Sequence, residues 1–186
     1  MLYRDRYVVP SIRLKRWDDR SPGYYFVTIC AKQRWTKPFG HIQHGYMCLS
    51  DIGTMAHRYW WDIPNHFQNV TLDKFVVMPD HVHGIIRINH NQMMSDHRSV
   101  ETRHVASLQN ADYDNRMFNK FGGLPKNSLS SIIHAYKSTI TRWCNQNHQR
   151  FQWQPRYYEK IIRSHRELLH VRQYILNNPK KWYNDK

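Results

Sequence analysis

The sequence predicts an α+β fold in which helices pack on an antiparallel sheet, and three observations support this prediction. Segments rich in β-branched and aromatic residues alternate with segments whose apolar residues recur every three or four positions. The two kinds of segment lack the regular strand–helix–strand spacing of a parallel sheet. No glycine-rich phosphate-binding loop joins a strand to a helix. At 186 residues, 40% of them hydrophobic, the chain is expected to form one domain around one core.

The first half of the chain contains most of the expected strands. Residues 1 to 22 are expected to form a basic arm that ends in the turn sequence Ser-Pro-Gly. Residues 24 to 33 are dense in aromatic and β-branched residues and predict a strand, and residues 39 to 50 predict a short hairpin. Further strands are expected before and after Pro79, which cannot donate a hydrogen bond within a sheet.

Two helices are expected to cover this sheet. Ser50 or Asp51 begins the first, which runs to about Asp62, with Pro64 just beyond its end. Ser128 begins the second, whose apolar residues are spaced by three, four and seven positions. That spacing places them on one stripe, which predicts that the stripe faces the core.

A third helix follows a predicted strand at residues 156 to 162. Ser164 and Glu167 match the S-x-x-E capping box, in which each side chain satisfies a free amide of the first turn. The packed face of the helix is formed by Leu168, Val171 or Arg172, and Ile175. Pro179 is expected to end the helix, because proline lacks an amide proton and disfavours helical geometry at the preceding residue.

Residues 90 to 127 differ in character from the rest of the chain. They are polar and show no sustained apolar period. A loop of this length is unusual in a compact domain, so the segment is expected to be either disordered or a functional insertion.

The net charge points to a polyanionic partner. The chain carries 28 lysines and arginines against 14 acidic residues, a formal charge of +14. Basic and aromatic residues are interleaved, a mixture that suits single-stranded nucleic acid. The candidate phosphate contacts are Lys137, Arg142, Arg156, Lys160 and Arg163, each with a plain solvated surface as the alternative. The candidate stacking residues are Trp153, Tyr157 and Tyr158, each with core packing as the alternative.

The sequence gives no indication of a membrane or an oxidising compartment. No apolar run is long enough to span a bilayer, and the charged N-terminus does not resemble a signal peptide. Cys30, Cys48 and Cys144 are widely spaced and match no paired metal motif. We therefore expect reduced thiols, no membrane partner and a cytoplasmic protein, associated with the nucleoid if it binds DNA.

Two histidines one residue apart suggest a metal site. Side chains alternate along a strand, so His81 and His83 point the same way, about 7 Å apart, while Val82 faces the core. Two histidines are an incomplete site, and exposed or hydrogen-bonded imidazoles are the alternative. Tyr174 and Asn178 lie one helical turn apart on a shared face. They suggest a phenolic nucleophile beside a further ligand, or else a packed tyrosine and a capping asparagine.

Several motifs in order make a family resemblance visible. These are "RLKRWDDRSPGYYFVTICAKQR", "FVVMPDHVHGII", "SLSSIIHAYKSTITR", "WQPRYYEKIIRS" and "RQYILNNPKKW". With them the chain resembles the IS200-type tyrosine transposases, specifically the REP-associated branch of these single-tyrosine HUH endonucleases. The resemblance implies that residues 1 to 186 form one transposase domain with a ferredoxin-like fold. It places the HUH pair on a central strand and the catalytic tyrosine on the C-terminal helix.

The resemblance also implies roles for individual residues. His81, His83 and Asn178 would hold Mg²⁺ or Mn²⁺, and Tyr174 would attack single-stranded DNA to give a 5′-phosphotyrosine and a free 3′-hydroxyl. The implied substrate is hairpin DNA at palindromic repeats, and the implied assembly is a homodimer. Asp80 departs from the pattern, because asparagine is more often expected before the first histidine.

Two other functions are compatible with these residues. The first is a domesticated relative that binds structured DNA or RNA without cutting it. A metal hydrolase would use the two histidines with water as the nucleophile and would leave no protein-linked DNA.

Overall fold

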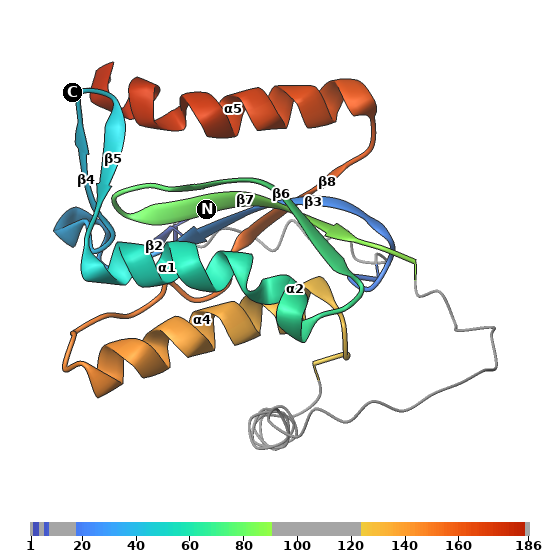
Figure 1. Ribbon diagram of the computed structural model, residues 1–186, viewed down its shortest axis with the longest axis horizontal. Helices are drawn as coiled ribbons and strands as arrows, with labels where there is room; N and C mark the ends of the chain where they lie inside the picture. Colours follow the sequence, from blue (N-terminus) through green and yellow to red (C-terminus); the bar gives the residue numbers. More distant parts are fainter. Residues whose placement is uncertain (1, 4–5, 8–17, 91–123, 185–186) are drawn as a thin grey trace, which may run out of the picture.

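Four strands form a central antiparallel sheet in the computed structural model, which describes residues 2–3, 6–7, 18–90 and 124–184 (Figure 1). The strands lie in the order β6-β7-β3-β8. Their bounds are Val70–Val77 for β6, His81–Ile88 for β7, Gly23–Cys30 for β3 and Tyr158–Ile162 for β8. The chain order β3-α1-β6-β7-α4-β8 is the ferredoxin-like arrangement, which confirms the predicted fold class.

Helices cover both faces of this sheet (Figure 1). On one face lie α1 (Asp51–Trp61), the single turn α2 (Ile63–His66) and α4 (Leu129–Gln146). On the other face lies α5 (His165–Asn184). A hairpin of β4 (Gly40–Gln43) and β5 (Tyr46–Leu49) stands near the C-terminal end of α5, after the 3₁₀ turn η1 (Arg34–Thr36).

The remaining predictions on domain organisation lie mostly outside the described residues. Most of the expected basic arm does so, although β1 (Leu2–Tyr3) and β2 (Arg6–Tyr7) pair as a short antiparallel ladder. Most of the expected insertion at residues 90 to 127 also lies outside. The single domain over residues 1 to 186 therefore stays a prediction.

The helix starts are set by serine caps. The hydroxyls of Ser50, Ser128 and Ser164 each accept a hydrogen bond of 3.1 Å from the amide three residues later. The other half of the predicted capping box differs by one residue. The Glu167 carboxylate accepts from the amide of Arg163, at 2.9 Å, one position before the cap.

Of two predictions about proline, one is confirmed and one was wrong. Pro64 lies just beyond the end of α1, as predicted, and falls in the first turn of the extra helix α2, where a missing amide proton costs nothing. Pro179 does not end α5, which continues to Asn184. The last turns are held by tertiary contacts that outweigh the lost hydrogen bond: Lys180 lies against Gly45 of the hairpin, and the Trp182 ring lies 5.9 Å from the His81 ring.

Two apolar clusters hold the layers together. The larger joins the sheet to α1 and α4 and includes Val82, as the alternation along β7 predicts. In this cluster the Trp60 ring packs directly on Gly84, where even a methyl group would collide with it at 2.1 Å. The smaller cluster joins the sheet to α5 and consists of Phe26, Ile85, Ile162, Leu168 and Ile175. No helix in the described part of the chain has the length and apolar character needed to cross a membrane.

Candidate active site

The two histidines lie side by side on β7, a central strand of the sheet, beneath α5. Both are buried, and their Nε2 atoms are 2.9 Å apart. The antiparallel register pairs His83 with Thr28 and His81 with Cys30 on β3. The sheet therefore presents both imidazoles on the face covered by α5, with their Nε2 atoms directed at one place.

The other nitrogen of each imidazole is held by a neighbouring side chain. Thr28 Oγ1 lies 2.8 Å from His83 Nδ1, and Asp80 Oδ1 lies 2.5 Å from His81 Nδ1. A carboxylate can only accept a hydrogen bond, so His81 Nδ1 is the donor to Asp80. In the neutral imidazole this tautomer leaves the lone pair on Nε2. The Thr28 hydroxyl can donate or accept and therefore suits either tautomer of His83.

Asp80 is itself fixed from the opposite side. The Arg34 Nε donates to Asp80 Oδ2 at 2.7 Å. Burial raises the pKa of the Asp80 carboxyl, but hydrogen bonds from His81 and Arg34 outweigh burial and hold that pKa below its usual value. Asp80 is thus ionised at neutral pH and connects η1 to the first histidine.

His83 is neutral at physiological pH. Burial, and next the neighbouring His81, lower the pKa of His83 to about 3. A neutral imidazole is the form that binds a metal ion, because its lone pair is not taken by a proton.

Helix α5 brings Tyr174 to the histidines. The phenolic oxygen lies 3.3 Å from His83 Nε2, and the Tyr174 ring meets the His83 ring at 5.3 Å between centroids. The Phe26 ring supports both, stacked on His83 and edge-on to Tyr174. Tyr174 is nevertheless 43% exposed, so a polymer substrate can reach it.

Asn178 lies on α5 between the two residues whose rings meet the histidines. It is one turn from Tyr174, which contacts His83, and one turn from Trp182, which contacts His81. Its side chain is buried, and its Nδ2 has no hydrogen-bond partner among the described residues. The two ends of an amide are alike in shape, so half a turn about the Cβ–Cγ bond places the oxygen in that position.

These donors fit a divalent cation. Within residues 18–90 and 124–184, no group of three His, Cys, Asp or Glu side chains is arranged to hold a metal. An ion at His81 and His83 would need further ligands, and the buried amide of Asn178, which lacks a partner for its Nδ2, is a candidate for one of them. Two neutral imidazoles and one amide oxygen are ligands that a divalent ion accepts.

The predicted nucleic-acid contacts are scattered over the molecule. Lys137 on α4 donates to the backbone carbonyls of Gln154 (2.8 Å) and Arg156 (3.1 Å), and burial lowers its pKa to about 8. Lys160 pairs with Glu167 at 2.6 Å. Arg156 and Arg163 are exposed, and Arg142 is half-buried on α4. Of these five, only Lys160 lines the same pocket as Tyr174.

The predicted stacking residues pack within the protein. Trp153 and Tyr157 lie against the larger apolar cluster, and Tyr158 lies against the smaller one. The Trp153 indole also donates to the carbonyl of Lys137 at 3.1 Å. Core packing, the alternative left open by the sequence, is what the structure shows for these rings, and their contact with bases stays a prediction.

Sequence reasoning missed four residues of the site: Thr28, Arg34, Trp182 and, in its role, Asp80. Thr28 is identified only by the register between β3 and β7. The segment around Arg34 is basic and aromatic, but nothing in it indicates a partner 46 positions away. Trp182 lies beyond the proline that was expected to end the helix.

Comparison with known proteins supports the fold. No family model matches the chain. An uncharacterized protein of Haemophilus influenzae strain Rd is 36% identical over 176 residues, which cover 94% of this chain and 90% of that protein. The solved structure of a REP-associated tyrosine transposase bound to a REP hairpin is similar with a TM-score of 0.56 and 18% identity, over 90% of this chain and 72% of that chain. A putative transposase from Deinococcus radiodurans R1 matches at 16% identity over 84% of this chain and 91% of its own, with a TM-score of 0.37, too low to support an argument.

Proposed function

The chain belongs to one family with the Haemophilus influenzae protein and has the fold of the REP-associated tyrosine transposase, and we propose that it is a single-tyrosine HUH transposase. One observation carries the proposal. The Tyr174 oxygen lies 3.3 Å from His83 Nε2, which lies 2.9 Å from His81 Nε2, although Tyr174 is 91 positions from His83 in sequence. Binding alone requires no such arrangement, whereas a positioned nucleophile beside a pair of potential metal ligands suits attack on a phosphodiester.

The proposed substrate is single-stranded DNA beside a hairpin. The formal charge of +14 favours a polyanion, and the similar transposase is bound to a REP hairpin. Tyr174 is exposed enough to meet a strand. A homodimer and a location at the nucleoid are further parts of the proposal.

The proposed reaction is a transesterification. The Tyr174 oxygen forms a bond to phosphorus, and the bond from phosphorus to the 3′-oxygen breaks. The phenolic proton is lost and the leaving 3′-oxygen gains one, which yields a 5′-phosphotyrosine and a 3′-hydroxyl. The ordinary pKa of a phenol is about 10, so the proton must leave at or before attack. The new ester conserves the energy of the old bond, so the reverse reaction rejoins a strand.

We propose that His81, His83 and Asn178 hold Mg²⁺ or Mn²⁺. Such an ion, when bound, supplies Lewis acidity and alignment to phosphate oxygens. Asp80 and Thr28 orient the two imidazoles so that both Nε2 atoms face one point. Phe26 holds the Tyr174 ring against His83.

The proposal is tested with labelled hairpin oligonucleotides and Mn²⁺. The protein is expected to form a covalent adduct that survives a denaturing gel, and Tyr174→Phe is expected to abolish it while hairpin binding, measured by fluorescence anisotropy, is retained. Tyr59→Phe on α1, on the opposite face of the sheet, is the matched control and should form the normal amount of adduct.

Three results would contradict the proposal. An undiminished adduct from Tyr174→Phe would show that another residue is the nucleophile. Nicking without an adduct, retained in that variant, would favour a hydrolase that uses water. Tight binding with no nicking across varied hairpins would favour a binding protein that does not cut.

A further inference from the structure

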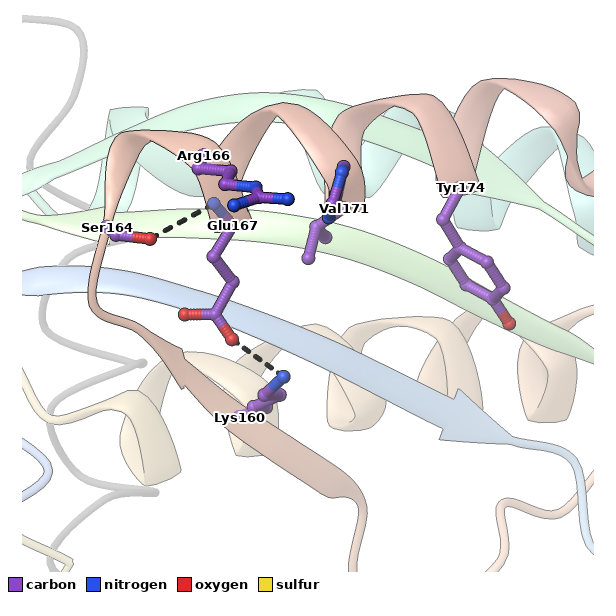
Figure 2. Close-up of a pocket in the computed structure, with 7 residues that line it drawn as sticks. Lys160, Ser164, Arg166, Glu167, Val171 and Tyr174 are labelled. Carbon is purple, nitrogen blue, oxygen red and sulfur yellow. Dashed lines mark hydrogen bonds and ion pairs between the residues drawn. The ribbon is translucent and has the colours of Figure 1, made fainter.

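A pocket of about 470 Å³ opens beside Tyr174, between β8 and the first half of α5 (Figure 2). It is separate from the histidine pair, which does not line it. The charged and polar side chains that line it are Lys160 from β8, the helix cap Ser164, and Arg166, Glu167, His170 and Tyr174 from α5. Tyr174, the proposed nucleophile, therefore also lines this pocket.

The pocket and Asn178, the proposed metal ligand on α5, lie on opposite sides of Tyr174 along this helix. Arg166, His170, Tyr174 and Asn178 follow each other at four-residue spacing and so form one stripe, with about 6 Å between successive members. Asn178 lies one turn C-terminal to Tyr174, and Arg166 lies two turns N-terminal to it. A strand with a phosphate at Tyr174 can therefore continue along the stripe into the pocket.

The charge of the pocket is positive because its acid is already paired. The Glu167 carboxylate accepts from the Lys160 ammonium at 2.6 Å and from the Arg163 amide at 2.9 Å. Arg166 is exposed, and its side chain makes no hydrogen bond or ion pair with the described residues. A guanidinium with its donors free, two turns from a nucleophile for phosphate, suits a second phosphate, which it can bind through two parallel hydrogen bonds.

We infer that this pocket binds a phosphodiester of the same strand, within a few nucleotides of the phosphate that Tyr174 attacks, with Arg166 as its main ligand and His170 beside it. The inference rests on the proposed function, because Tyr174 defines which phosphate is attacked. It adds a subsite that holds the strand on the side away from the metal-binding residues. The bound phosphate lies on either the 5′ or the 3′ side of the attacked one, which the experiment distinguishes.

The test measures binding rather than cleavage, so every variant also carries Tyr174→Phe. The probe is a fluorescein-labelled hairpin oligonucleotide with single-stranded flanks, and the readout is fluorescence anisotropy across a series of salt concentrations. Arg166→Ala is expected to weaken binding about tenfold, and the slope of log K against log salt should fall by about 0.7, as for one lost phosphate contact on a single strand. Arg166→Lys should recover part of the affinity, because it keeps the charge but not the fork of donors.

The matched control is Arg58→Ala, an exposed arginine of α1 on the opposite face of the sheet, which should leave affinity and slope unchanged. Oligonucleotides with a neutral methylphosphonate at one position in turn then locate the contact. A methylphosphonate at one position in a flank, within a few nucleotides of the expected cleavage site, should weaken binding of the oligonucleotide to the parent protein. The same methylphosphonate should not weaken binding to Arg166→Ala.

The inference is overturned if Arg166→Ala binds like its parent with the same salt slope, or if no methylphosphonate loses its effect in that variant. The adduct assay on the labelled hairpin, carried out beside the binding series, separates this inference from the proposed function. Loss of affinity through Arg166→Ala without any adduct from the Tyr174 protein contradicts the nuclease and supports the pocket. An adduct with no effect of Arg166 contradicts the pocket alone.

Discussion

The two faces of the central sheet bury different kinds of side chain. The face under α1 and α4 carries the larger apolar cluster, which includes Ile132 and Trp60. Between the sheet and α5 lie five buried apolar residues, together with the buried polar groups of Asp80, His81, His83 and Asn178. Burial of polar groups costs free energy unless each finds a partner. The apolar face under α1 and α4 therefore supplies stability that offsets the cost of burying polar groups under α5.

The largest expected effect is on the apolar face. Ile132→Ala should lower the free energy of unfolding by about 2–5 kcal/mol, because it leaves a cavity in a fully buried position of α4. Leu176→Ala on α5, where the side chain is 55% exposed, should change it by less than about 0.5 kcal/mol. Urea unfolding measures both. Equal losses would show that the two faces contribute alike.

On the polar face, Asp80→Ala should weaken Mn²⁺ binding by about 10- to 100-fold, because His81 loses the acceptor that orients it. Asp80→Asn should have a smaller effect, since its oxygen still accepts from His81 while its NH₂ faces the Arg34 donor. Isothermal titration calorimetry of the metal measures both. Asp62→Ala at the end of α1 is the control and should bind Mn²⁺ normally. Unchanged affinity in Asp80→Ala would remove Asp80 from the site.

Asn178→Leu should separate stability from function. It replaces a buried amide nitrogen that lacks a partner with an apolar group of similar size, so the metal-free protein should become more stable by about 1 kcal/mol. Mn²⁺ affinity should fall at the same time. Gln173→Leu, exposed on the same helix, is the control for added apolar surface. A less stable protein would show that the Asn178 amide has a structural partner.

The smallest effect concerns Lys137, whose pKa burial lowers from 10.5 to about 8. Between these pH values the unfolded chain binds more protons than the folded protein, so stability should rise with pH in this window. Lys137→Met removes the effect, and the difference in unfolding free energy between the two proteins should grow in favour of the wild type from pH 8 to 10. A difference independent of pH would mean that the ammonium is solvated and free to meet phosphate.

Local patterns in the sequence predicted much of the fold. The prediction that α4 begins at Ser128 is confirmed, because a helix cap depends on residues only three positions apart. His81 and His83 were correctly placed on one face by the two-residue period of a strand, with Val82 in the core. Tyr174 and Asn178 were placed on one stripe by the helical period in the same way.

Contacts between distant segments were decided by the tertiary structure alone. The packing of α5 over β7 brings Tyr174 to His83, and the register of β3 puts Thr28 beside the same ring. Asp80 was the one residue of its segment without an explanation until the fold brought Arg34 to it. The sequence by itself determined which side chains share a face, because periodicity is a property of neighbouring residues. Which faces meet depends on strand order and helix packing, which neighbouring residues do not encode.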